Sequence, residues 1–354
     1  MTRSTPAPDR DVLVVGAGFA GLYALYSALR AGLDTVCLEA ASGVGGTWHF
    51  TRYPGARCDV ESIDYSYSFD EELQKEWRWT ERYATQPEIL AYINHVADRF
   101  DLRRHIRLNT RVGSARFDEQ RSLWRVRTER GEEYRARYLF LATGALSAPH
   151  LPDIPGRDDF AGQVLLTAQW PEEPPSLAGK RVGVIGTGSS GIQLVPIVAR
   201  EAASLTVFQR TANYSVPVLN RALDDAEWER VLRDYPERRR KSRHSGGGSP
   251  HESHPRRAVE LDEAERTAAL EARWNEGGVL FGKTFPDQTT DPVANDYARR
   301  FAEAKIRELV DDPRTAEDLI PRDHPIGTKR ICTDSGYYQT FNRDNVTLVN
   351  LRRT

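Results

Sequence analysis

Near the N-terminus, the pattern of hydrophobic and polar positions predicts a short buried strand followed by an amphipathic helix. An apolar run over residues 11–15 ends in Gly16, and residues 19–31 carry apolar side chains at helical spacing. Residues 34–39 form a second apolar run, and Gly32 stands where a helix is expected to end. The pattern predicts a strand–helix–strand unit near the N-terminus.

The same pattern returns in the middle of the chain. Residues 181–185 form an apolar run that ends in Gly186, a helix is expected to about Arg200, and residues 204–208 predict the next strand. Between the two units, residues 86–100 predict a helix with Pro87 in its first turn, and three β-rich runs within 106–141 predict a meander. Residues 43–69 are too irregular for a simple helix or strand, and residues 144–160 read as a linker.

These elements predict an α/β fold with two Rossmann-like dinucleotide-binding domains and a mainly helical insertion. We expect the first domain over residues 1–144, the second over 145–222 and again over 322–354, and the insertion over 223–321. The insertion is interrupted by a polar loop over 245–255, which we expect to be a solvated, mobile insertion without chemistry. Its two histidines, His251 and His254, lack a recognisable set of metal ligands, so no metal is expected.

Composition narrows the classes of partner. The chain has 354 residues, and 49 Lys and Arg against 51 Asp and Glu give a net charge of −2, so no nucleic acid is expected as a partner. No apolar run is long enough for a membrane span, and residues 1–10 do not read as a signal peptide. The three cysteines have no metal-type spacing and are odd in number. We expect a cytoplasmic monomer.

The first candidate for chemistry is a glycine-rich turn between strand and helix. Gly16 permits the tight turn, Gly18 lets the backbone approach a pyrophosphate, and Gly21 permits close packing of helix on strand. A phosphate would then lie at the positive end of the helix. Glu39 ends the next strand, where a carboxylate accepts hydrogen bonds from a ribose.

The second glycine-rich turn has the same spacing as the first, but the strand that follows its helix ends in different residues. That strand ends in Arg210 and Thr211, which suit a 2′-phosphate, so this turn favours NADPH over NADH. Two such turns in one chain are usually explained by a flavin on the first and a nicotinamide on the second. The residues of the second turn are Gly186, Thr187, Gly188, Ser189, Ser190 and Gly191.

Several blocks of the sequence resemble the type I Baeyer–Villiger monooxygenases, which include phenylacetone, cyclohexanone and steroid monooxygenases. The resemblance covers nearly the whole chain. It is carried by residues 45–48 (GGTW), 53–62 (YPGARCDVES), 79–83, 86–89, 141–144, 184–193, 327–330 (GTKR) and 341–346.

The resemblance implies a flavoprotein that reduces FAD with NADPH, binds O₂ and uses a flavin C4a-peroxide to convert a ketone into an ester or lactone. It makes Arg330 the fixed positive charge beside the peroxide and Asp59 the residue that orients Arg330. Lys329 would join Arg210 and Thr211 on the 2′-phosphate. By the same resemblance, FAD would be lined by Glu39, Thr47, Trp48, Asp59, Tyr65 and Val112, and NADP by Arg57, Cys58, Asp59 and Gln193.

Two departures from the family pattern affect these expectations. Leu166 stands where the family fingerprint has a histidine, which puts in doubt the coupling of NADP binding to domain movement. The chain stops at Thr354, earlier than family members. We expect the C-terminal parts of both nucleotide domains to be missing, with unpaired sheet edges, uncovered apolar faces, low stability and weak FAD binding.

Two alternatives to a Baeyer–Villiger enzyme remain open at this point. One is a flavin-dependent N- or S-monooxygenase, which would share both glycine-rich turns. The other is a truncated, non-catalytic FAD- and NADP-binding fragment. The ketone or heteroatom substrate cannot be read, because Tyr337, Tyr338 and Phe341 fit a substrate pocket and a core equally well.

Overall fold

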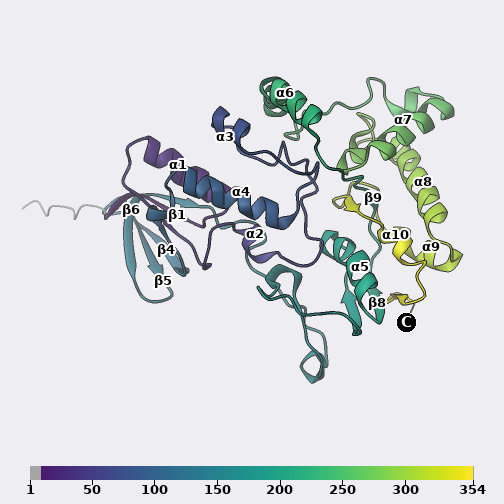
Figure 1. Ribbon diagram of the computed structural model, residues 1–354, viewed down its shortest axis with the longest axis horizontal. Helices are drawn as coiled ribbons and strands as arrows, with labels where there is room; N and C mark the ends of the chain where they lie inside the picture. Colours follow the sequence, from purple (N-terminus) through teal and green to yellow (C-terminus); the bar gives the residue numbers. More distant parts are fainter. Residues whose placement is uncertain (1–8, 354) are drawn as a thin grey trace, which may run out of the picture. The chain divides into compact units, whose positions relative to one another are not determined.

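The computed structural model describes residues 9–353 and has the expected α/β architecture (Figure 1). It divides into two compact units. The first unit contains the described residues up to Tyr53 together with Gln86–Pro174, and the second contains Pro54–Thr85 and the chain from Pro175 onward. The predicted domain boundaries remain a prediction, but the segment 54–85 belongs to the same compact unit as the second half of the chain.

The first unit is built on one sheet with the strand order β3-β2-β1-β6-β5-β4. Strand β1 is parallel to β2 and β6, whereas β4, β5 and β6 form the expected antiparallel meander. Helices α1 and α4 lie side by side in Figure 1, and the rings of Phe19 and Tyr92 are 6.2 Å apart between them. The strands are Arg10–Val15 (β1), Thr35–Leu38 (β2), Ile106–Arg107 (β3), Val112–Asp118 (β4), Leu123–Thr128 (β5) and Glu133–Leu141 (β6), and the helices are Phe19–Arg30 (α1), Thr47–Phe50 (α2) and Gln86–Arg99 (α4).

The first of the three expected β-rich runs is not one strand. It separates into β3, which pairs with β2, and β4, which joins the meander. Asn109 between them has a φ of 53°, a left-handed backbone that ends an extended strand. The sequence pattern had no signal for this break other than the asparagine itself.

The second unit contains the second strand–helix–strand motif, which confirms that prediction. Its parallel sheet has the order β11-β8-β7, and α5 follows β7 directly. Strands β9 and β10 form a further parallel pair that the sequence did not indicate, because three residues are too few for a periodicity. The elements are Arg181–Ile185 (β7), Ser189–Glu201 (α5), Ser204–Gln209 (β8), Ser215–Pro217 (β9), Cys332–Asp334 (β10) and Val346–Asn350 (β11).

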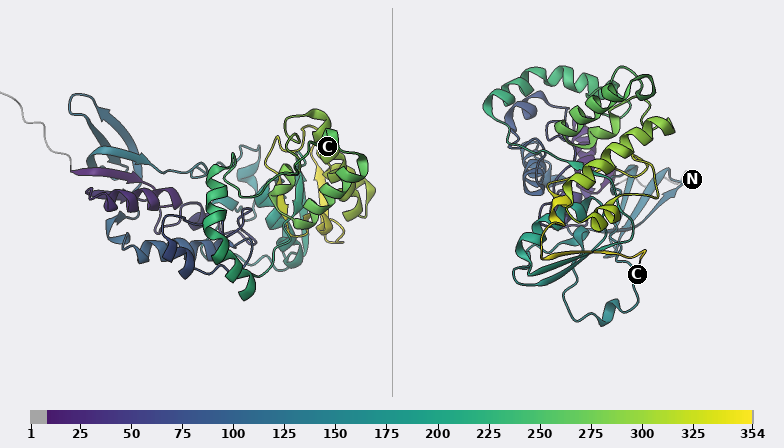
Figure 2. Two further views of the ribbon diagram at one scale, coloured as in Figure 1. Left: turned by 90° about the horizontal axis from the view of Figure 1, so that it is seen from above. Right: turned by 90° about the vertical axis from the view of Figure 1, so that its right-hand side faces the viewer.

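The expected helices over 223–321 are present, and they share a core with residues outside that range. The four α-helices of the insertion, drawn in green to yellow-green in Figure 2, follow aspartate N-caps, whose side chains accept hydrogen bonds from N–H groups of the first turn. The core includes Trp274, Phe281 and Ile331. The helices are Asp225–His244 (α6), Glu263–Glu276 (α7), Pro292–Leu309 (α8) and Pro313–Leu319 (α9), with the short Glu71–Glu76 (α3) and Tyr337–Thr340 (α10) elsewhere in the unit. Single-turn 3₁₀ helices cover Arg103–His105, Arg157–Asp159, Thr167–Gln169, Ala258–Glu260 and Val279–Lys283.

Tyr337, Tyr338 and Phe341 are buried, which assigns them to the core rather than to an open pocket. Within residues 9–353, none of the helices combines the length and apolarity that crossing a membrane requires.

Large apolar side chains are exposed on the six-stranded sheet and on the three-stranded sheet. In β6, Tyr138 is 57% and Phe140 is 50% exposed, although their register partners on β1, Val12 and Val14, are buried. Ile185 is 67% exposed on β7, which is an edge strand among the described residues. Exposed apolar positions of this kind favour association with another surface.

Phe140 and its register partner Val14 provide a matched test of this exposure. Phe140→Thr should change the free energy of unfolding by no more than about 0.5 kcal/mol, because the ring is half exposed, and should reduce binding of a hydrophobic dye. Val14→Thr should cost about 1–3 kcal/mol, because it buries a hydroxyl. Denaturant titration and dye fluorescence check both, and equal destabilisation by the two substitutions would contradict the expectation.

Candidate functional site

The first glycine-rich turn, between β1 and α1, accepts only glycine at two positions. Gly16 has a φ of +102°, and a Cβ there would lie 2.5 Å from the Ala142 carbonyl oxygen. A Cβ on Gly21 would lie 1.7 Å from the Gly16 oxygen. Gly18 is the N-cap of α1, and as a glycine it offers no side-chain cap to the first turn of the helix. The turn therefore has the geometry that a phosphate requires.

The loop that carries Thr47 and Trp48 packs on this turn. The Gly45 N–H donates to the Ala17 carbonyl at 3.0 Å, and a Cβ on Gly46 would lie 3.0 Å from the Gly18 Cα. Thr47 begins α2, and Trp48 is buried with its carbonyl accepting from the Gln86 side chain. The structure thus packs the loop that leads into Thr47 and Trp48 on the first turn, and their contact with FAD stays a prediction.

Glu39 follows β2 and is buried against the same turn. Its Oε2 accepts from the Ala17 N–H at 2.5 Å and its Oε1 from the Ala41 N–H at 2.8 Å. A carboxylate has about four lone-pair sites, so it can accept from a ribose as well. The Glu39 carbonyl also accepts from the Thr110 N–H at 2.8 Å, which places the start of β4 at Val112 close to this end of β2.

The second turn repeats the glycine geometry. Gly186 has a φ of +108°, and a Cβ on Gly191 would lie 2.5 Å from the Gly186 oxygen. The Thr187 hydroxyl donates to the Thr211 carbonyl at 2.6 Å, which ties the turn to the end of β8. Ser189 and Ser190 open α5 after Gly188, and the Ser189 hydroxyl donates to the Cys332 sulfur at 3.4 Å.

Arg210 and Lys329, the two cations predicted for the 2′-phosphate, are both exposed. Within residues 9–353, the side chains of Arg210 and Lys329 make no hydrogen bond or ion pair with another side chain. Sequence reasoning missed a third cation, Arg352, whose guanidinium donates to the Thr211 hydroxyl at 3.3 Å and to Asp323 at 2.7 Å. Only the pairing of β11 with β8 brings Arg352 to this position, so no local sequence signal could have indicated it.

Arg330 and Asp59 form a bidentate pair although 271 positions separate them in the sequence. The guanidinium Nε and Nη2 each donate to one carboxylate oxygen at 2.6 Å. The Arg330 side chain is 62% exposed and Asp59 only 17%. The hydrogen bond to Asp59 raises the pKa of Arg330 further, so this cation is permanently charged. One face of a fixed charge is therefore held by protein and the other remains accessible.

The neighbours of Asp59 anchor it to the second unit. Burial raises the pKa of the Cys58 thiol to about 12, which excludes a thiolate role, and the Cys58 N–H donates to the Ala84 carbonyl at 3.1 Å. The Arg57 guanidinium lies 3.4 Å from Glu81. Tyr65 is also in the second unit, with its N–H donating to the Glu61 carbonyl, whereas Glu39, Thr47, Trp48 and Val112 are in the first. Leu166, the departure from the fingerprint, is partly buried in the first unit.

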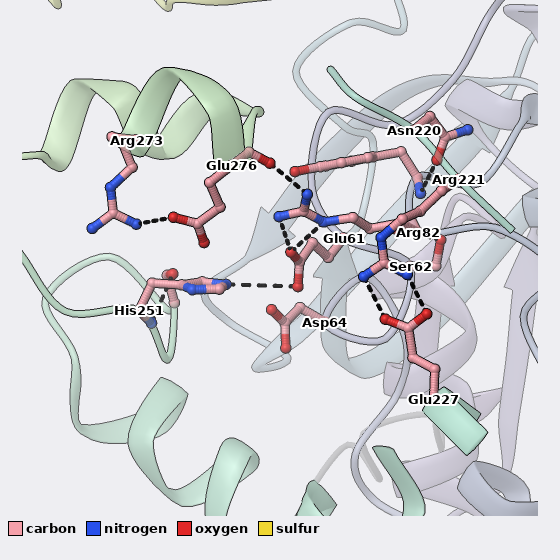
Figure 3. Close-up of polar contacts among 12 residues, drawn as sticks. Glu61, Ser62, Asp64, Arg82, Asn220, Arg221, Glu227, His251, Arg273 and Glu276 are labelled. Atoms are coloured by element: carbon pink, nitrogen blue, oxygen red, sulfur yellow. Dashed lines mark hydrogen bonds and ion pairs between the residues drawn. The ribbon is translucent and has the colours of Figure 1, made fainter. Parts of the chain in front are cut away.

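A buried ionic cluster that the sequence did not indicate holds the same segment (Figure 3). Glu61 lies between Arg82, at 2.8 Å, and Arg238, which also pairs with Asp64 at 2.7 Å. Burial opposes the ionisation of Glu61, but His251, Arg238 and Arg82 lower its pKa well below the usual range. The cluster draws on four segments that are far apart in the sequence, around Glu61, Arg82, Arg238 and His251, and only the fold brings them together.

The loop over 245–255 is less solvated than expected, because His251 faces this cluster. Its Nε2 lies 3.6 Å from Glu61, and Glu61, Asp64 and His251 have the spacing of metal ligands. Both carboxylates are already engaged by guanidinium groups, and a cation would have to displace them. An adjoining cavity of about 580 Å³ is lined by both acidic and basic side chains, so its electrostatic potential does not favour a ligand of one charge.

The fold and the two turns define an α/β protein with two Rossmann-like glycine motifs. A sequence profile described as FMO-like, flavin-binding monooxygenase-like, matches residues 9–234. The chain belongs to this family.

Individual relatives are similar over nearly the whole chain. A Baeyer–Villiger monooxygenase of Pseudooceanicola batsensis is 44% identical over 98% of this chain and 64% of its own length. A phenazine N-monooxygenase of Lysobacter antibioticus is 44% identical over 96% of this chain and 63% of its own length. The structure of an oxidised steroid monooxygenase bound to NADP superposes with a TM-score of 0.95 at 62% identity, over 98% of this chain and 66% of that one. The chain spans about two thirds of the length of these relatives.

Replacing Glu61 tests the ionic cluster. Glu61→Gln should destabilise the protein by about 3–5 kcal/mol at neutral pH, because it leaves two largely buried guanidinium groups without their carboxylate. The loss should shrink as the pH falls below about 4.3, the ordinary glutamate value, because the lowered pKa of Glu61 makes its contribution disappear on acidification. Urea titrations from pH 7 to pH 3 measure both effects. Glu173→Gln, at an exposed site, is the control, and a pH-independent difference would contradict the assignment.

Proposed function

We propose that the protein is an FAD- and NADPH-dependent Baeyer–Villiger monooxygenase that converts a ketone into an ester or lactone with O₂. The observation that carries the proposal is the bidentate contact between Asp59 and Arg330, which holds a permanent, accessible positive charge. Similar proteins named for ketone oxidation support the reaction class.

Both nucleotide sites fit their proposed cofactors. At the first turn the close approaches of Gly16, Gly21 and Gly46 leave backbone exposed to a pyrophosphate, and Glu39 is placed for a ribose, which suits FAD. At the second turn the unpaired charges of Arg210 and Lys329 suit a 2′-phosphate, which favours NADPH.

The bound flavin supplies the chemistry of oxygen activation, using a hydride from NADPH. The protein's own residues supply orientation and charge. Arg330 presents guanidinium N–H groups to an anionic oxygen that reacts with the ketone, and it cannot lose its proton at any working pH. Asp59 occupies two of the five N–H donors, so the plane of the guanidinium is fixed before the substrate arrives.

N-oxidation is the second candidate function, because the similar phenazine enzyme has that name. A non-catalytic nucleotide-binding protein is the third, and Leu166 is the residue that favours it. We also propose a cytoplasmic location, which is consistent with three buried cysteines that form no disulfide, and a monomeric state.

Product analysis tests the reaction and the role of Arg330. With FAD, NADPH and O₂, the protein should convert members of a ketone panel to esters or lactones, and Arg330→Gln should lower that rate about 10²–10³-fold, the usual effect of removing one such donor. Arg314→Gln, an exposed arginine on α9, should leave the rate unchanged. Gas chromatography of a ketone and a thioether separates the candidates. Sulfoxide without ester would favour heteroatom oxidation, and the absence of oxygen-dependent NADPH consumption would favour the non-catalytic protein.

The 2′-phosphate site has a separate test. Arg210→Gln should weaken NADPH binding about 10–100-fold, the equivalent of about 1.5–3 kcal/mol for one charge-assisted hydrogen bond, and leave NADH binding unchanged. Arg181→Gln, at the opposite end of β7, should affect neither cofactor. Calorimetric titration with both nucleotides measures this, and an equal loss for NADPH and NADH would show that Arg210 does not read the phosphate.

A further inference from the structure

The side chain of Gln193, one helical turn into α5, is bonded to the backbone of Arg57. The Arg57 N–H donates to Gln193 Oε1 at 3.3 Å, and Gln193 Nε2 donates to the Arg57 carbonyl at 3.3 Å. The side-chain amide thus satisfies both backbone groups of Arg57, the N–H and the carbonyl, as a residue on a neighbouring β-strand would. Sequence reasoning placed Gln193 among the cofactor ligands, which stays a prediction, and in the structure its amide oxygen and nitrogen both bond to this segment.

A second contact joins the same two segments. Gly55 has a φ of +83°, and a Cβ there would lie 2.9 Å from the Gln193 carbonyl oxygen and 3.1 Å from Ile197 Cγ1. The segment around Arg57 therefore lies directly on the backbone of α5, and any larger residue at position 55 would force it away. Side-chain pairing and close packing together hold the segment around Arg57 against α5.

The junction connects two parts of the proposed site. The N-terminus of α5 follows the second glycine turn, where a pyrophosphate would lie. On the other side, Asp59 is two residues beyond Arg57 and holds Arg330. The Cys58 N–H is bonded to the Ala84 carbonyl, so the backbone between Arg57 and Asp59 has little freedom.

We propose that Gln193 is a positioning residue that couples occupation of the second nucleotide site to the Asp59–Arg330 pair. The inference rests on the proposed function, because it requires NADP at that site. A nucleotide that orders the first turn of α5 orders Gln193, and through Arg57 it fixes the carboxylate that orients Arg330. Gln193 acts on the charge and not on the nucleotide.

Hydrogen–deuterium exchange of the full chain, with and without saturating NADP⁺, tests the coupling. In the unmodified protein NADP⁺ should slow exchange in a peptide covering residues 54–60, at least threefold. Gln193→Leu removes both hydrogen bonds and should abolish that protection, while the affinity for NADP⁺ by calorimetry changes less than threefold. Gln193→Asn, whose side chain is one methylene shorter, should behave like Gln193→Leu. Gln339→Leu, at an exposed glutamine on α10, should retain the protection.

Each other outcome has a distinct meaning. A more than threefold loss of NADP⁺ affinity in Gln193→Leu would make Gln193 a direct ligand of the nucleotide and would overturn the coupling. Protection that survives in Gln193→Leu would also overturn it, as would NADP⁺ binding to the unmodified protein without protection of residues 54–60; both would leave the proposed function standing. Failure of the unmodified protein to bind NADP⁺ would instead overturn the proposed function, and the coupling with it.

Discussion

The segment from Pro54 to Ser62 is the constraint on which the candidate site depends. It lies early in the chain, between elements of the first unit, yet its contacts are made in the second. Gln193 holds its start, Ala84 its middle, and the Glu61 cluster its end. Asp59 lies between these anchors, so the position of one carboxylate is determined by three independent sets of contacts.

The anchors differ in physical kind, and each contributes in its own way. The Glu61 cluster is largely buried, so its charges must be satisfied or the fold loses several kcal/mol, about 3–5 for a broken buried pair. The Gln193 contact consists of neutral hydrogen bonds, each worth about 0.5–1.5 kcal/mol. The Glu61 cluster therefore keeps the segment attached to the unit as long as the protein is folded. The Gln193 hydrogen bonds are weaker, so a nucleotide that binds at the N-terminus of α5 can change them.

The two glycine turns were predictable from the sequence because their chemistry is local. Gly16 and Gly21 lie within six residues, and so do Gly186 and Gly191, so spacing alone indicated the close backbone approach that the structure shows. Strands β1, β2, β7 and β8 followed from short apolar runs, and the insertion was expected only to be mainly helical. The expected single run over 106–117 was wrong because one left-handed residue, Asn109, is invisible to periodicity.

The site beyond the turns was not predictable in the same way. Arg330 and Asp59 were named through a family resemblance, because no pattern in the chain joins residues 271 positions apart. The ionic partners of Glu61 (Arg82, Arg238 and His251) come from three other segments, and Arg352 reaches Thr211 only through the pairing of β11 with β8. Such contacts depend on the tertiary fold, and a single sequence contains no local signal for them.

The exposure of Arg330 argues for a role beyond stability. An ion pair with one side chain 62% in solvent contributes about 0–1 kcal/mol, so folding gains little from it. Its geometry is nevertheless bidentate, and its carboxylate partner belongs to the segment 54–62, which contacts with Gln193, Ala84 and Arg82 anchor. The Asp59 contact therefore fixes the orientation of an accessible guanidinium while adding little to the free energy of unfolding. This arrangement is expected where the remaining N–H donors must bind an anion in one orientation.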